Sequence, residues 1–153
     1  MPPEHHFRLP QSIALSVTLL CLMSGVATLE NSAAGKSQSQ QLPEVFRRLS
    51  PSVSCGAVPH LTEQWTALRA SGVRTIVSVD GAKPDVEAAT SAGLRYVHIP
   101  MGYDGIPESV IGQLTRVMRE VEPSIYVHCQ HGKHRGPAAA AVCALIAGDF
   151  DTG

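Results

Sequence analysis

Residues 128–137 bring together side chains that could bind and attack an anion, and they read HCQHGKHRGP. Five residues separate Cys129 from Arg135. A cysteine thiolate is a strong nucleophile, and a guanidinium offers a planar fork to two oxygens of a tetrahedral anion. Gly132 can adopt backbone conformations closed to other residues, which helps a short loop to curl. The spacing therefore predicts a site in which Cys129 attacks a phosphorus atom held beside it.

The segments on either side of this loop are expected to position it. Residues 124–128 read as a strand, and residues 136–147 read as a helix that begins with Gly-Pro. Backbone N–H groups at the start of a helix form a concave anion site, and the helix dipole stabilises a thiolate there. His131, Lys133 and His134 would add positive charge around the same loop.

Strands and helices alternate along the chain before this loop. Apolar periodicity and Gly or Pro boundaries predict helices near residues 62–72, 84–93 and 107–123, and strands over 73–79 and 94–99. Such alternation predicts an α/β fold with a mainly parallel sheet flanked by helices. Ligands of these sheets bind at the carboxyl ends of the strands, where Cys129 is expected.

Length and charge limit what the chain can be. Its 153 residues allow one domain of ordinary size, and 44% of them are hydrophobic. The formal net charge is −1, which excludes a basic field covering the whole protein, and aromatic residues make up only 5%. We therefore expect no nucleic-acid partner, and any anion site must be local.

The motif around Cys129 resembles the signature of a known family. His128-Cys129, five residues and then Arg135 match the cysteine-dependent protein tyrosine and dual-specificity phosphatases. Residues 54–59 and 73–77 look like parts of bacterial dual-specificity-like domains, so the resemblance spans roughly residues 42–147. It implies a phosphotyrosine-phosphatase-like fold and hydrolysis of phosphomonoesters without a metal or organic cofactor.

The resemblance also implies a role for each residue of the loop. Cys129 would form a phosphocysteine intermediate, and Arg135 would bind the phosphate and stabilise the transition state. His128 would support the thiolate and the geometry of the loop. The residues expected to line the phosphate site together with Arg135 are Gln130, His131, Gly132, Lys133 and His134.

The family uses an aspartate on a separate loop to protonate the leaving group and then to activate water. Asp104 is the best match, because it follows the strand predicted to end at residue 99 and should reach the same sheet edge as Cys129. Asp80, which follows the strand over 73–79, is the alternative acid.

Two positions depart from the family pattern. Gly136 stands where the family has Ser or Thr, whose hydroxyl assists release of the thiolate, so breakdown of the intermediate is expected to be slow or to be helped by another group. Lys133 matches a loop lysine of some phosphoinositide phosphatases, which indicates a multiply charged substrate. The substrate class stays open between a phosphorylated protein, a lipid and a small molecule.

Other functions fit parts of the same motif. Gly136 and an uncertain acid at Asp104 leave room for a phosphate-binding pseudophosphatase that does not turn over. A rhodanese-like sulfur transferase or an arsenate reductase also holds a cysteine in an anion loop, and Cys55 or Cys143 could serve the latter. His128, His131 and His134 recur every three residues and could bind zinc.

Three other residues that could do chemistry are expected to have structural roles: Cys55, Cys143 and His98. Cys143 in the predicted last helix and His98 on a predicted strand are expected to be structural. Cys55 is also expected to pack in the core. Its alternative role is that of a partner that protects an oxidised Cys129.

The N-terminus reads as a targeting segment. Residues 12–27 form an apolar run preceded by Arg8 and ending in Gly-Val-Ala, as in a secretory signal cleaved near Ala27. We expect a signal peptide over 1–27, a flexible linker over 28–41 and a phosphatase-like domain over 42–153. The protein would then be exported to a periplasmic or extracellular space. Membrane anchoring is the alternative if the segment is not cleaved.

The last predicted helix is apolar nearly all round, with the sequence AAAAVCALIA over residues 138–147. Such a helix is expected to be covered on all sides. Only six residues follow it, so the sequence predicts a fragment, a truncated protein or a helix covered by another chain.

Overall fold

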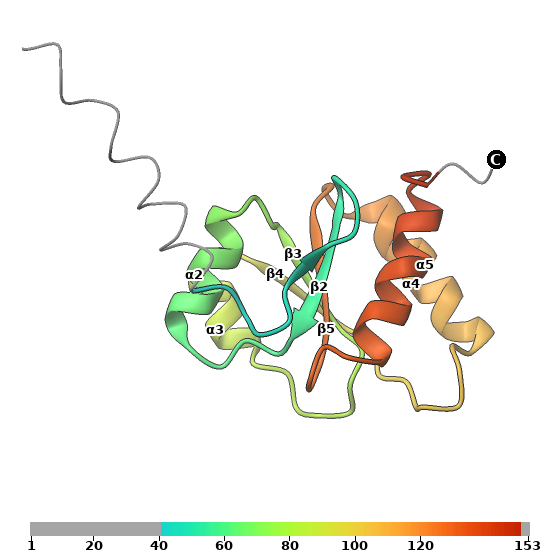
Figure 1. The fold of residues 1–153 in the computed structure, drawn as a ribbon, viewed down its shortest axis with the longest axis horizontal. Helices are drawn as coiled ribbons and strands as arrows, with labels where there is room; N and C mark the ends of the chain where they lie inside the picture. The colour runs from blue at the N-terminus through green and yellow to red at the C-terminus, as the bar shows by residue number, and fades with distance from the viewer. Residues whose placement is uncertain (1–40, 151–153) are drawn as a thin grey trace, which may run out of the picture. The chain divides into compact units, whose positions relative to one another are not determined.

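A computed structural model describes residues 41–150, which belong to the compact unit Ser37–Gly153. The predicted signal segment and nearly all of the predicted linker lie outside the described residues. Five strands form one sheet in the order β1-β2-β5-β3-β4 (Figure 1). The strands are β1 (Arg47–Arg48), β2 (Val53–Ala57), β3 (Thr75–Ser78), β4 (Arg95–His98) and β5 (Ile125–Cys129). Only β1 pairs antiparallel, so the predicted mainly parallel sheet is confirmed.

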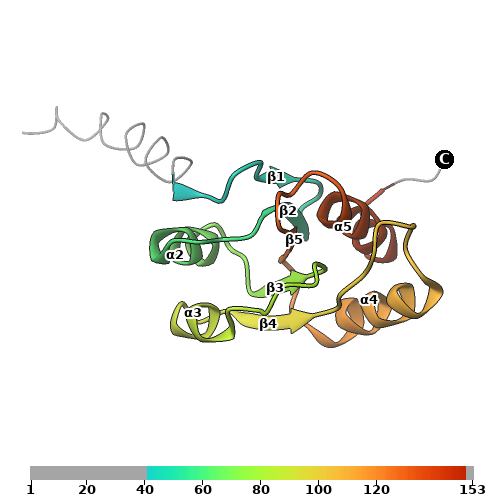
Figure 2. The same cartoon turned by 90° about the horizontal axis from the view of Figure 1, so that it is seen from below.

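Helices cover both faces of the sheet. Figure 2 shows α2 (Thr62–Ala70) and α3 (Val86–Ser91) on one face, and α4 (Glu108–Glu120) and α5 (Arg135–Ile146) on the other. Because successive strand residues point to opposite faces, neighbouring residues of β5 enter different cores. Tyr126 packs with Trp65 and Leu68 of α2, whereas Val127 packs with Cys143 of α5. The predicted α/β fold with helices flanking the sheet is therefore confirmed.

The sheet has two strands, β1 and β2, that the pattern of the sequence did not predict. β2 reads VSCGA, and this mixture of small and polar residues has a low strand propensity. All five of its residues are nevertheless buried, because β2 lies beneath α5 and beside β5. The strand is only five residues long and four of its residues are small or polar, so its sequence did not mark it as a strand.

Strand register brings the carboxyl ends of β2, β3 and β5 together. Ala57 pairs with Cys129, and Ser78 pairs with His128. Just past the strands, the N–H of Val79 donates to the carbonyl oxygen of His128 at 3.0 Å. The loops that follow β2, β3 and β5 therefore start side by side at one edge of the sheet.

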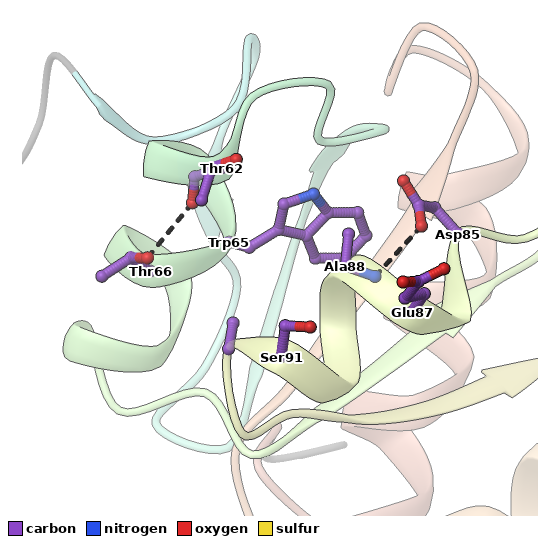
Figure 3. A pocket seen from close by; sticks show the side chains of 8 residues that line it. Thr62, Trp65, Thr66, Asp85, Glu87, Ala88 and Ser91 are labelled. Carbon is purple, nitrogen blue, oxygen red and sulfur yellow. Dashed lines mark hydrogen bonds between the residues drawn. The ribbon is translucent and has the colours of Figure 1, made fainter.

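A pocket of about 340 Å³ lies between α2 and α3, on the face away from α5 (Figure 3). The indole of Trp65 extends from α2 toward α3, where Asp85 and Glu87 also line the pocket. None of the residues predicted to act on phosphate lines this pocket. The predicted chemistry therefore lies away from this pocket, at the start of α5.

The helices of residues 41–150 are all too short or too polar to cross a membrane. α5 packs against β2, β5 and α4, but no described residue covers its outer side, where Leu145 is 54% exposed.

Candidate active site

Cys129 is the last residue of β5, and its side chain is 5% exposed. The chain then runs through five loop residues to Arg135, the first residue of α5. The predicted strand, loop and helix are thus observed in this order, and the helix begins one residue earlier than expected. This arrangement puts the sulfur at the carboxyl edge of the sheet, beside the start of α5.

Two glycines allow the loop to fold tightly. Gly132 has a φ of +64°, and a Cβ there would overlap the backbone of Gly56 and Ala57 at the end of β2. A Cβ on Gly136 would lie 3.0 Å from the amide nitrogen of Cys129. The loop is therefore held between β2 and the first turn of α5, with Cys129 at its base.

The backbone amides of this loop have no hydrogen-bond acceptor among the described residues. Within residues 41–150, no acceptor takes a hydrogen bond from an N–H of residues 130–135. His134, at the N-cap of α5, makes no capping hydrogen bond with its side chain. Uncapped amides and the positive end of the helix dipole together favour a negative group at this position.

The guanidinium of Arg135 is held by one nitrogen, and a second nitrogen has no partner among the described residues. Nη1 donates to the carbonyl oxygen of Met101 at 3.0 Å. Nε is buried and has no hydrogen-bond partner among the described residues. Nε and Nη2 lie on the same edge of a guanidinium, which is the edge that binds two oxygens of a phosphate. A buried donor without a partner calls for an explanation, and a bound oxyanion would provide one.

Positive side chains surround the loop. His131, Lys133 and His134 are exposed, and no carboxylate of residues 41–150 forms a salt bridge with Lys133 or Arg135. The zinc alternative finds no support in the same part of the chain, which contains no group of three metal-ligating side chains. The imidazole of His128 is only 1% exposed, so it is buried while the two loop imidazoles lie at the surface.

His128 packs behind the nucleophile. Its Nε2 lies 2.9 Å from the hydroxyl of Tyr96, and its ring stacks on Tyr126 at a centroid distance of 6.2 Å. Burial lowers the pKa of His128 to about 4, and the nearby carboxylate of Asp80 opposes this shift only in part. His128 is therefore neutral near pH 7 and brings no positive charge to Cys129.

The two candidate acids occupy different surroundings. Asp80 is 3% exposed; one carboxylate oxygen accepts from the N–H of Ala82 at 2.8 Å, and the other lies 3.7 Å from Nδ1 of His128. Asp104 is exposed on the loop between β4 and α4. The neighbouring Tyr103 contacts the guanidinium of Arg135 with its ring. A group that protonates a leaving group must face the substrate, and this requirement favours Asp104.

The other cysteines lie in the core. Cys55 and Cys143 are 1% and 0% exposed, and burial raises the pKa of both thiols, that of Cys143 to about 12. The expected packing role of Cys143 is confirmed. All three described cysteines have free thiols, so a protective partnership between Cys55 and Cys129 stays a prediction.

Three contacting residues were not found from the sequence: Tyr96, Met101 and Tyr103. Tyr96 reaches His128 across 32 positions, and Met101 reaches Arg135 across 34. Such contacts depend on which strands become neighbours. The one local signal was the position of Tyr103 directly before the candidate acid Asp104.

No known protein-family profile matches this sequence, and no curated protein matches it. Solved structures do match the fold. A candidate phosphatase of the DUF442 group from Shewanella putrefaciens gives a TM-score of 0.62 at 20% identity, over 76% of this chain and 80% of the other. TpbA from P. aeruginosa gives 0.54 at 22% identity, over 74% of each chain. The catalytic core of the S. cerevisiae PP-IP phosphatase SIW14 gives 0.54 at 19% identity, over 61% of this chain and 60% of that one.

These neighbours agree with the resemblance that the motif around Cys129 suggested. Each is a phosphatase or candidate phosphatase, and PTPMT1 is a further match at a TM-score of 0.56 and 18% identity. The chain has the fold of the cysteine-dependent protein tyrosine and dual-specificity phosphatases.

Proposed function

We propose that this protein is a cysteine-dependent phosphatase that hydrolyses phosphomonoesters. The observation that carries the proposal is the set of unused donors around Cys129. The free amides of residues 130–135 and the unpartnered Nε of Arg135 lie at the start of a helix that follows directly from the cysteine. A phosphate monoester carries the oxygens that such donors bind.

The proposed reaction has two steps. The Cys129 thiolate attacks phosphorus, an S–P bond forms and the ester P–O bond breaks, while Asp104 gives its proton to the leaving oxygen. Asp104 then takes a proton from water as the water oxygen attacks phosphorus and the S–P bond breaks. Inorganic phosphate leaves, and the thiolate is restored. Arg135 and the loop amides stabilise the charge on the phosphoryl oxygens in both steps.

The test is release of phosphate from p-nitrophenyl phosphate by the full chain. Cys129→Ser should abolish turnover, because a serine hydroxyl is a far weaker nucleophile than a thiolate, and a chelator should have no effect. Cys143→Ala is the matched control, since it removes a thiol from α5 and should leave turnover in place. Equal activity of Cys129→Ser and the unmodified chain would refute the proposal.

For the natural substrate, we propose only that it carries a phosphate monoester. A cysteine-to-serine variant of the structural neighbour TpbA binds phosphotyrosine, and SIW14 is a PP-IP phosphatase. We therefore propose a panel of phosphotyrosine, phosphoserine, inositol phosphates and phosphoinositides as substrates. The exposed His131, Lys133 and His134 favour the more highly charged members of this panel.

A second candidate function rests on Gly136. The hydroxyl expected at this position from the family resemblance is missing, so the chain could bind phosphate without completing turnover. Phosphate affinity without release from any phosphoester would favour this pseudophosphatase. Comparison of the unmodified chain with Cys129→Ser separates the two functions, because only an active enzyme has a rate of phosphate release that the substitution can abolish.

We also propose that residues 1–27 direct export of the protein and that the domain over 42–153 acts outside the cytoplasm. The apolar run over residues 12–27 supports this proposal. The N-terminal sequence of the protein recovered from its producing cells tests it. A mature chain that begins near residue 28 is expected, and a chain that retains Met1 in a soluble extract would refute the proposal.

A further inference from the structure

The loop between β4 and α4 contacts Arg135 through one exposed aromatic ring. The ring of Tyr103 lies over the guanidinium, with its centroid 4.5 Å from Cζ. The same ring meets the imidazole of His134 edge-on at 6.4 Å. The carbonyl oxygen of Met101, two residues earlier, accepts the hydrogen bond from Nη1. The loop that carries Asp104 is therefore attached to the anion-binding loop at three points.

These contacts leave one edge of Arg135 free and fix the rest. The ring covers a face of the guanidinium, and Met101 occupies Nη1. What remains is the edge formed by Nε, which has no partner among the described residues, and Nη2. An arginine held on one face and at one nitrogen has few remaining orientations, so less entropy is lost when the free edge binds an oxyanion.

Tyr103 itself contributes little to the core. Its side chain is 70% exposed, and its hydroxyl makes no hydrogen bond to any residue in 41–150. Tyr103 also lines a small pocket of about 200 Å³ together with Met101, Ile106 and Ala138, among other residues. The exposed ring is therefore not explained by packing, whereas its position over a cation has a direct physical use.

We propose that Tyr103 is a positioning residue for the phosphatase reaction. Its ring holds the Arg135 guanidinium so that the Nε and Nη2 edge faces the phosphate, and it ties this edge to the loop that carries Asp104. The inference rests on the proposed function. It adds that binding of the phosphate and placement of the acid are coupled through one aromatic contact.

Coupling of this kind is reciprocal. If the Tyr103 contact ties the two loops together, an oxyanion bound to Arg135 must stabilise residues 101–106 by the same free energy with which these residues favour the oxyanion. Removal of the ring should weaken both effects. Removal of the hydroxyl alone should weaken neither, because the cation–π contact needs only the ring.

Two substitutions in the full chain separate these cases. Tyr103→Phe keeps the ring, and Tyr103→Leu removes it from an exposed position where folding should be unaffected. The dissociation constant of inorganic phosphate is measured by NMR titration. We expect a change of less than about twofold for Tyr103→Phe and a weakening of about three- to tenfold for Tyr103→Leu. Phe150→Leu removes another exposed ring, at the far end of α5, and should change nothing.

Hydrogen exchange of residues 101–106 gives a second readout that does not depend on turnover. Saturating phosphate should slow exchange in the unmodified chain and in Tyr103→Phe, and it should have little effect in Tyr103→Leu. In kinetics, Tyr103→Leu should raise KM and lower kcat together, and Tyr103→Phe should restore both. Equal phosphate affinity and equal protection in the leucine variant would overturn the proposal.

The two proposals can fail separately. Ring-dependent phosphate affinity in a chain that releases no phosphate from any ester would overturn the proposed function and leave the role of Tyr103 in place. Normal turnover in both Tyr103 variants would overturn the role of Tyr103 and leave the proposed function in place.

Discussion

The loops that precede α3 and α5 occupy equivalent places in the fold, because each leads from the carboxyl end of a parallel strand into a helix. In the loop before α3, the chain binds its own amides. The carboxylate of Asp80 accepts from the N–H of Ala82, and that of Asp85 accepts from the N–H of Ala88 at 3.1 Å. In the loop before α5, no side chain caps the helix and the amides are unused within residues 41–150.

The difference shows how one architecture can give either a closed turn or a binding site. Negative groups stabilise the N-terminus of a helix, and in α3 this negative charge comes from the carboxylates of its own loop. Residues 130–135 contain no acid and carry Lys133, Arg135 and two histidines, so α5 can take negative charge only from outside this loop. A formal net charge of −1 for the chain does not prevent this, because the separation of charge is local.

The largest loss of folding stability is expected for a substitution of Gly132, in the loop before α5. Gly132→Ala should destabilise the fold by about 4 kcal/mol, because a strained positive φ and overlap with the β2 backbone add together. Urea denaturation measures this loss. Gly72→Ala is the control, since Gly72 has a φ of +100° but nothing within 4 Å of its Cβ position. Equal losses in the two variants would contradict the steric argument.

The next largest effect is a dependence of folding stability on pH, caused by His128, which lies where the two loops meet. Its pKa is about 4 in the folded protein and 6.5 in an exposed chain, so the unfolded state binds more protons between these values. The stability contributed by neutral His128 is complete above pH 6.5. It is lost as the pH falls toward 4, by about 3 kcal/mol in total.

Unfolding free energies at pH 7 and pH 5 test this prediction. Replacement of His128 by Asn should flatten the dependence on pH, even if it lowers stability at both values. The matched control is His131→Asn, which removes an exposed histidine of the loop and should leave the dependence unchanged. A steep slope that persists without His128 would assign the titration to another group.

A smaller effect is expected at the start of α3. Asp85→Ala removes the N-cap and should cost about 1 kcal/mol of stability without any change in phosphate affinity. Asp85→Asn keeps a capping oxygen and should cost only a few tenths of a kcal/mol. A loss of phosphate affinity in either variant would mean that the two helix starts are not independent.

The smallest change in stability is expected at Gly136. A serine Cβ there would lie 3.0–3.4 Å from the backbone of His128 and Cys129, so a shift of a few tenths of an ångström should accommodate it. Its hydroxyl should speed breakdown of the phosphocysteine, while stability changes by less than about 1 kcal/mol. Stopped-flow measurement should show a smaller initial burst in Gly136→Ser. An unchanged burst would show that thiolate release is not limited at this position.

Much of the fold could be predicted from local patterns. The apolar stripe of α4 and the β-branched run of β3 follow directly from the spacing and type of their residues. The loop after Cys129 was predicted because its cysteine, glycine and arginine need one another at short range. β2 was missed because it is short and rich in small and polar residues, which have a low strand propensity.

The contacts that refine the site could not be predicted in this way. The pairing of β3 with both β4 and β5 brings Tyr96 and Asp80 toward His128. The spacing of residues along the sequence does not predict this order of strands. The same limit applies to Met101 and Tyr103 at Arg135. Both aspartates proposed as acids follow a strand, and the family resemblance favoured Asp104 over Asp80. In the structure, burial separates Asp80, which faces inward, from the exposed Asp104.

The hydrogen bond between Arg135 and Met101 gives this arginine two tasks at once. Nη1 is hydrogen-bonded to the protein backbone, and Nε has no partner among the described residues and could donate to a bound phosphate. A lysine has a single ammonium group, which would have to choose between anchoring the neighbouring loop and meeting the phosphate. Replacement of Arg135 by lysine would therefore lose either the contact with Met101 or the contact with phosphate, even though the net charge of the chain would not change.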